Sequence, residues 1–191
     1  IFLLMRYEMR IIIFTIALLF NVPLLAKDCS ELLDFNVKTL DKGQLVNLCE
    51  KYQGKVILVV NTASRCAYTD QYDSLEKLYT EYRESGLVVL GLPSNGFGHQ
   101  EPGTEKEIKS FCRLTYGVDF PMFSKTRVAY RNADPFYRKL AEVSGTYPQW
   151  NFHKYLIDSD GRFVTSYKSS IDPMDPQVTD RIQSELKRVR F

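Results

Sequence analysis

The chain has 191 residues, of which 45% are hydrophobic and 25% are charged, the composition of one ordinary globular domain. The formal net charge is only +2, and no basic run alternates with aromatic residues. These features argue against a nucleic-acid partner.

The N-terminal segment has the pattern of a secretory signal peptide. Met9-Arg10 precedes an apolar run, and the small residue Ala26 stands before Lys27. We therefore expect residues 1–26 to be removed, leaving 27–191 as a single domain that is secreted or periplasmic. The alternative is an uncleaved anchor, but the run is shorter than the roughly 20 apolar residues that span a bilayer, so no stable membrane anchor is expected.

The first half of the remaining chain alternates between strand and helix patterns. Apolar residues alternate on either side of the turn Asp41-Lys42-Gly43, which predicts an N-terminal β-hairpin over 34–47. Two β-branched runs, at 56–61 and 87–92, predict buried parallel strands, and the 70–85 segment between them has helical spacing. Gly86 is placed to end this helix.

The second half adds further helices and a second hairpin. Thr104 and Glu107 form a capping box for a helix that runs to about Leu114. The remaining predicted elements are helices near 135–143 and 176–189 and strands at 154–158 and 163–167. This order predicts an α/β thioredoxin-like fold, with a central mixed sheet flanked by helices.

Cys66 is the strongest candidate for chemistry. It follows the strand at 56–61 and stands beside Arg65, in the N-terminal region of the predicted helix. Unpaired backbone N–H groups at a helix start favour the thiolate, which is the nucleophilic form of cysteine. The alternative is an inert buried thiol.

Four motifs occur in order and carry a family resemblance. They are Asn61-Thr62-Ala63-Ser64-Arg65-Cys66, Phe97-Gly98-His99-Gln100-Glu101-Pro102-Gly103, Tyr116-Gly117-Val118-Asp119-Phe120-Pro121-Met122-Phe123 and Trp150-Asn151-Phe152. Together they resemble the glutathione peroxidase family, in a cysteine-containing, secreted bacterial-type form. The resemblance covers about Leu33 to Leu186.

The resemblance implies a thiol-dependent peroxidase that protects against oxidative stress. Cys66 would reduce hydrogen peroxide or organic hydroperoxides through a sulfenic acid. Gln100, Trp150 and Asn151 match the family's catalytic donors, whose neutral N–H groups can stabilise a thiolate and a departing oxygen. Alternative interpretations are a core tryptophan and a solvated glutamine. No metal, flavin or nicotinamide cofactor is implied, and glutathione or a thioredoxin-like protein would be the reducing co-substrate.

The four cysteines allow three disulfide pairings. In an oxidising compartment, we prefer a structural disulfide between Cys29 and Cys49, which leaves Cys66 and Cys112 for redox work. Relatives that use thioredoxin carry a resolving cysteine in the helix before the Phe-Pro motif. Cys112 is a possible resolving residue, but it comes one residue early, and one residue turns a helical side chain by about 100°. If Cys112 packs in the core, a small thiol such as glutathione would reduce Cys66.

Further expectations concern the histidines, the assembly and rival functions. His99 and His153 have no metal-ligand spacing with the cysteines, and we expect His153 at the surface or on an edge strand. The 123–150 segment is too short for the oligomerisation loop of tetrameric relatives, so a monomer is expected. The rival functions are a peroxide-driven disulfide oxidant or redox relay in the envelope, and a non-catalytic thioredoxin-fold binding module.

Overall fold

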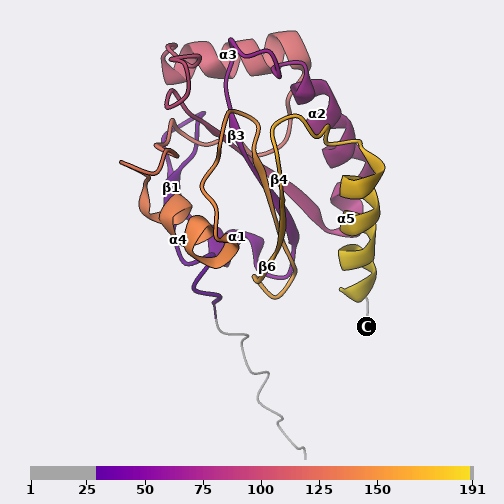
Figure 1. Cartoon of the computed structure of the whole chain (residues 1–191). Helices are drawn as coiled ribbons and strands as arrows, with labels where there is room; N and C mark the ends of the chain where they lie inside the picture. The colour runs from indigo at the N-terminus through magenta and orange to yellow at the C-terminus, as the bar shows by residue number, and fades with distance from the viewer. Residues whose placement is uncertain (1–28, 190–191) are drawn as a thin grey trace, which may run out of the picture.

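The computed structural model describes residues 29–189, so the predicted signal peptide lies outside the described residues. Its centre is a four-stranded sheet in the order β4-β3-β5-β6 (Figure 1). The strands are β3 (Val56–Thr62), β4 (Leu87–Pro93), β5 (Lys154–Ile157) and β6 (Phe163–Tyr167). Strands β3 and β4 are parallel, whereas β5 is antiparallel to both β3 and β6. A separate antiparallel hairpin joins β1 (Asn36–Lys38) and β2 (Leu45–Asn47). The predicted thioredoxin-like fold is confirmed.

Helices cover both faces of this sheet. One face carries α2 (Gln71–Tyr82), which is followed by the 3₁₀ turn η1 (Arg83–Ser85), and α5 (Pro176–Arg188); the other carries α1 (Leu48–Tyr52) and α4 (Pro135–Ser144) (Figure 1). Helix α3 (Glu105–Tyr116) crosses one end of the molecule. The predicted capping box at the start of α3 is present, and Gly86 adopts the left-handed conformation after η1.

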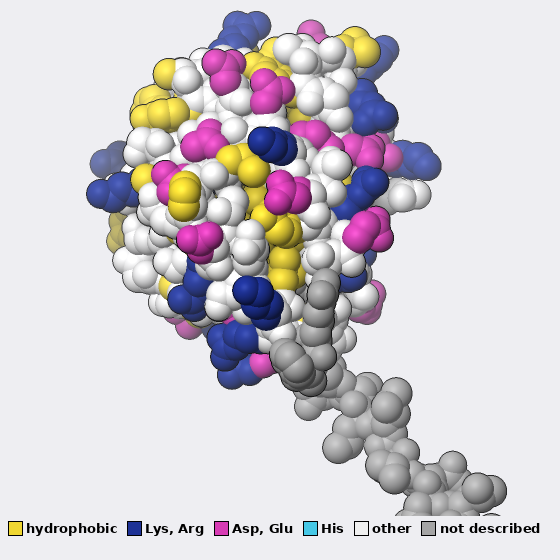
Figure 2. Space-filling view, turned by 90° about the vertical axis from the view of Figure 1, so that its right-hand side faces the viewer, with side chains coloured by type: hydrophobic (Ala, Val, Ile, Leu, Met, Phe, Trp, Pro, Cys, Tyr) yellow, Lys and Arg dark blue, Asp and Glu magenta, His cyan; other side chains and the backbone are white. Residues whose placement is uncertain are grey.

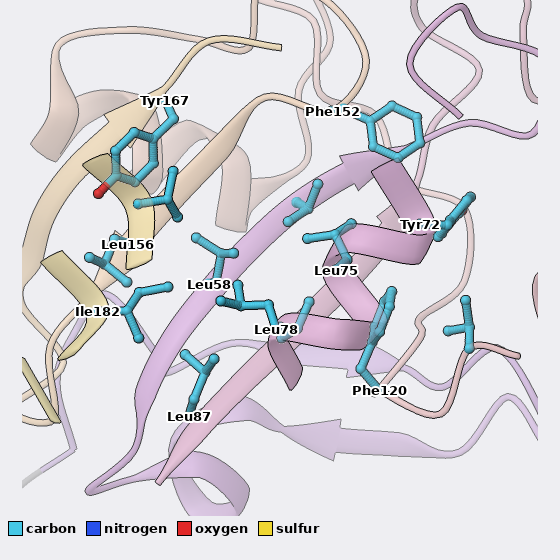
Figure 3. Packing of buried hydrophobic residues seen from close by; sticks show 14 of the residues in the cluster. Leu58, Tyr72, Leu75, Leu78, Leu87, Phe120, Phe152, Leu156, Tyr167 and Ile182 are labelled. Carbon is cyan, nitrogen blue, oxygen red and sulfur yellow. The ribbon is translucent and has the colours of Figure 1, made fainter. Parts of the chain in front are cut away.

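Strand β3 is the core of the molecule because every residue in it is buried. Leu58 and Val60 point into the cluster under α2 and α5, whereas Ile57 and Val59 point into the cluster under α1 and α4. Figure 3 shows the first cluster, in which Leu58 lies among side chains from α2, β5 and α5. Burial of both faces explains why this strand reads as an unbroken apolar run.

The predicted disulfide between Cys29 and Cys49 is present, with a Cα–Cα distance of 5.8 Å. It fastens the chain before β1 to α1, and Cys49 itself is buried in the second core cluster. Cys66 and Cys112 are the free cysteines of residues 29–189.

The surface is of mixed charge on the face shown in Figure 2. Basic and acidic side chains are interspersed there, with a narrow band of hydrophobic side chains between them. Among the described residues, no helix is long and apolar enough to cross a membrane.

Candidate active site

Cys66 lies in the turns that connect β3 to α2 and is partly buried. Its backbone N–H donates to Thr69 Oγ1 at 2.9 Å, and the Thr69 hydroxyl donates to the Ala63 carbonyl at 3.0 Å. The Tyr68 N–H donates to Cys66 Sγ at 3.4 Å. Since α2 begins only at Gln71, the donor at the sulfur belongs to the preceding turn rather than to the first helical turn.

The structure joins Gln100 and Asn151, which are 51 residues apart in the sequence. Asn151 Nδ2 donates to Gln100 Oε1 at 2.9 Å, so the Nε2 end of the Gln100 amide is turned away from this bond. The Arg65 backbone N–H donates to the Gln100 carbonyl at 3.1 Å. The Gln100–Asn151 pair is therefore hydrogen-bonded to Arg65, the residue directly before Cys66.

Asn61, at the end of β3, holds the Trp150-Asn151-Phe152 segment. Its Nδ2 donates to the Trp150 carbonyl at 3.0 Å, and its own carbonyl accepts from the Phe152 N–H at 2.6 Å. Phe152 has a φ of 64°, in the left-handed region that is costly for a bulky residue. Its ring is anchored in the core against Tyr72, at 5.4 Å between centroids (Figure 3). This anchor fixes the direction of Asn151.

Trp150 is 38% exposed, which excludes the interpretation as a core aromatic. Its ring lies 5.7 Å from that of Phe97, centroid to centroid, at an interplanar angle of 38°. The indole thus stands at the rim of the site, over the Phe97–Gln100 loop, where it can contact an incoming molecule.

Cys112 faces the hydrophobic core and is 2% exposed. Burial raises the pKa of its thiol to about 11, whereas the neighbouring Tyr72 hydroxyl lowers it. The next residue, Arg113, is exposed and pairs with Asp119 at 3.1 Å. The expected rotation of Cys112 into the core is confirmed. A role for Cys112 as the resolving residue stays a prediction. Its burial and raised pKa argue against that role, because a buried neutral thiol is a poor nucleophile.

His153 is buried at 3% exposure, so the expectation of a surface or edge position was wrong. The residue leads into β5, which is an inner strand with partners on both sides. Its ring lies 4.8 Å from that of Tyr155, centroid to centroid, and neither ring nitrogen has a hydrogen-bond partner among the described residues. Burial, assisted by the charge of Lys154, lowers the pKa of His153 to about 4. Within residues 29–189, no group of three His, Cys, Asp or Glu side chains could hold a metal ion.

Sequence reasoning gave no role to Asn61, Thr69 or Glu101, whose side chains hydrogen-bond to the segments that carry the candidate residues. Asn61 and Thr69 had a detectable signal, because one is a polar residue at the end of an apolar strand and the other follows the cysteine by three residues. Glu101 had none, since its partner Ser64 is 37 residues away.

Comparison with known proteins identifies the same family over most of the chain. The family model for glutathione peroxidase matches residues 32–141. Glutathione peroxidase 7 of Homo sapiens is 48% identical over 141 residues, which are 72% of this chain and 75% of that protein. The glutathione peroxidase of Lactococcus lactis is 40% identical over 161 residues, 82% of this chain and 97% of its own. The crystal structure of Trgpx in its apo form superposes with a TM-score of 0.66 at 32% identity and covers 83% of this chain and 97% of that one.

A thioredoxin-like fold in which the turn that carries the cysteine is hydrogen-bonded to the Gln100 loop, together with these relatives, defines a thiol-dependent peroxidase. The chain belongs to the glutathione peroxidase family.

Proposed function

We propose that Cys66 is the peroxidatic residue, that Gln100 and Trp150 donate to the reacting oxygens, and that Asn151 completes the catalytic set by orienting the Gln100 amide, since its Nδ2 donates to Gln100 Oε1 and to the Phe97 carbonyl. The observation that carries this proposal is the 2.9 Å hydrogen bond between Asn151 and Gln100, because it orients a neutral amide beside the Cys66 turn. The thiolate sulfur attacks one peroxide oxygen; an S–O bond forms and the O–O bond breaks. Sulfur is oxidised to sulfenic acid, and the leaving oxygen takes up a proton and departs as water or an alcohol.

The return step requires a thiol reductant, and we propose that this is glutathione or another small thiol. One thiol condenses with the sulfenic acid to give a mixed disulfide and water, and a second thiol displaces Cys66 from it. Burial of Cys112 supports this one-cysteine cycle, because a thiol at 2% exposure with a raised pKa is a poor nucleophile. A thioredoxin-like protein is the second candidate reductant.

We also propose that the protein works outside the cytoplasm, in a secreted or periplasmic form, as a monomer. The Cys29–Cys49 disulfide supports export, since such bonds persist mainly in oxidising compartments. The apolar segment before Ala26 agrees with this assignment. The short connection between Phe123 and Trp150 supports the monomer.

Matched cysteine variants test the proposed function. Peroxide consumption with glutathione should vanish in Cys66→Ser and continue at the wild-type rate in Cys112→Ser, with circular dichroism confirming that both fold. Continued turnover by Cys66→Ser would refute the assignment. Loss of turnover with a thioredoxin-like reductant in folded Cys112→Ser would instead make Cys112 the resolving residue.

A further inference from the structure

We propose that Ser64 and Glu101 form a clasp that sets the position of Gln100 relative to the Cys66 sulfur, which makes Glu101 a positioning residue for the peroxide step. This inference rests on the proposed function of Cys66 and Gln100. It concerns two residues that do not themselves touch the peroxide.

The clasp is the side-chain member of two adjacent contacts between the two loops of the site. Ser64 Oγ donates to Glu101 Oε2 at 3.0 Å, and the Arg65 N–H donates to the Gln100 carbonyl at 3.1 Å. The Ser64 backbone also interacts with the Glu101 carboxylate and lowers its pKa. Two consecutive residues thus bind two consecutive residues in antiparallel order, and Cys66 is the next residue after this pairing.

Each loop is internally braced, so the clasp controls how one loop sits against the other. On one side, the Thr69 hydroxyl closes the Cys66 turn onto Ala63. On the other side, the Glu101 N–H donates to Asn95 Oδ1 at 2.9 Å, and the Gln100 N–H donates to the Phe97 carbonyl at 3.3 Å. Because each loop keeps its own shape, loss of the clasp shifts the whole Gln100 loop relative to the Cys66 turn.

The burial of Glu101 shows that the clasp is built into the fold. The residue is 1% exposed, and burial raises the pKa of its carboxyl, whereas Ser64, Lys125 and Arg65 act to lower it. A buried carboxyl destabilises a protein unless its oxygens find donors. Ser64 supplies such a donor at the point where the two loops meet. The buried Glu101 carboxylate therefore fixes the position of one loop relative to the other.

The clasp should affect peroxide more than other electrophiles. Reaction with peroxide needs a donor at the departing oxygen, which is the proposed role of Gln100. Alkylation by iodoacetamide needs the same thiolate but no donor at an oxygen leaving group. The ratio of the two rate constants at Cys66 therefore reports the placement of Gln100 separately from the reactivity of the sulfur.

The experiment measures both second-order rate constants for Cys66 in Ser64→Ala, Glu101→Ala, the double variant and Glu101→Gln. Displacement of a catalytic group by about 1 Å can cost on the order of a hundredfold, so we expect the peroxide-to-alkylation ratio to fall about tenfold or more in both alanine variants. The double variant should be no worse than Glu101→Ala, because Ser64→Ala removes only a contact that Glu101→Ala has already removed. Glu101→Gln should keep most of the wild-type ratio, since its amide oxygen still accepts from Ser64.

Ser74→Ala is the matched control, because the Ser74 hydroxyl also donates to a carboxylate at 3.0 Å, that of Asp172. It should leave the ratio unchanged. Ser64→Ala keeps the test available if Glu101→Ala does not fold.

An unchanged ratio in folded Ser64→Ala, or additive losses in the double variant, would overturn the clasp alone. A wild-type protein whose Cys66 reacts with iodoacetamide but not with peroxide would overturn the proposed function, and the clasp with it.

Discussion

Lys154 at the start of β5 is the clearest case of a polar side chain taken fully into the core near the site. It is completely buried, and its Nζ donates to Gln71 Oε1 and to the Ile171 carbonyl, both at 2.5 Å. Gln71, the first residue of α2, donates in turn to the Ser169 carbonyl at 2.8 Å. This network ties the start of α2 to the turn before α5. Burial lowers the pKa of Lys154 to about 7, and the Asp172 carboxylate opposes this shift only in part.

The lowered pKa of Lys154 predicts that stability rises with pH above neutrality. Between about pH 7 and the unfolded value of about 10.4, the unfolded chain holds a proton on Lys154 that the folded chain has lost, so raising the pH favours folding. Between pH 7.5 and 8.5, we expect this group to raise the free energy of unfolding by about 1 kcal/mol per pH unit, whereas cysteines that ionise in the unfolded chain act equally on the wild type and on Lys154→Met.

Urea denaturation of the wild type and of Lys154→Met at pH 7.5 and 8.5 measures this rise. The rise should be absent in Lys154→Met. An equal pH dependence in the two proteins would show that Lys154 keeps its proton when buried.

The lowered pKa of His153 predicts a loss of stability at acidic pH. Its pKa is lowered to about 4 in the fold, mainly by burial, so between about pH 6.5 and 4 the unfolded chain binds a proton that the native chain does not. Stability should therefore fall as the pH falls through this window. In His153→Phe, measured by the same denaturation at pH 7 and 5, the fall should be smaller than in the wild type; an identical fall would contradict the assignment.

The residue scale is also where sequence and structure differ most. Cys66, Gln100, Trp150 and Asn151 could be named from the sequence because each lies in a short motif. The contacts of Asn61, Glu101 and Lys154 could not, because each joins segments that are far apart in the chain, 83 residues in the case of Lys154 and Gln71. His153 was misplaced because a sequence of polar and apolar residues does not show which strand becomes an inner one.

Helix α3 is the element on which the catalytic cycle depends, since its rotation decides what Cys112 can do. The register follows from the sequence: the Thr104 capping box fixes the start, and Ile108 and Cys112, four residues apart, share the buried face. The left-handed Gly117 ends the helix. The predicted start of α3 after Thr104 was correct, whereas the helix ends at Tyr116, two residues beyond the predicted end.

The orientation of α3 predicts different reactivity for the two free thiols. Cys112 should be protected in the native protein, because it is buried and its pKa is raised to about 11, and Cys66 should react at once. Titration with an aromatic disulfide reagent should release one equivalent of thiol under native conditions and two in denaturant. Cys66→Ser provides the control and should release none until it unfolds. Rapid release of two equivalents from the native wild type would mean that α3 opens readily.

At the scale of the whole molecule, the sheet order β4-β3-β5-β6 brings three distant segments to one end of β3. The Cys66 turn follows β3, the Gln100 loop follows β4, and Asn151 precedes β5. Since β3 and β4 are parallel and β5 is antiparallel to β3, the ends of two strands and the beginning of the third meet there. The fold class could be predicted from the sequence. The hydrogen bonds between these three segments could not, because they depend on which strands pair in the sheet.

The disulfide should affect the stability of the whole domain, because it closes a loop across the N-terminal hairpin with a sequence separation of 20. Chain-entropy arguments give about 3 kcal/mol for a loop of this size. The variant with both Cys29→Ala and Cys49→Ala should lose about this much unfolding free energy in urea, with some addition from the methyl-sized gap at buried Cys49. Peroxide reactivity of the folded variant should be retained, because Cys49 lies in the cluster under α1 and α4, whereas Cys66 packs against the cluster under α2 and α5. A loss of less than about 1 kcal/mol would contradict the stabilising role of the disulfide.

The fate of Cys66 after one equivalent of peroxide decides whether this residue is peroxidatic. The purified protein is treated with hydrogen peroxide in the presence of a sulfenic-acid trap such as dimedone, digested and analysed by mass spectrometry. We expect a trap adduct on Cys66 alone, a reduced Cys112 and an intact Cys29–Cys49 disulfide. An unmodified Cys66 thiol would contradict its assignment as the peroxidatic residue, and a Cys66–Cys112 disulfide would contradict the one-cysteine cycle.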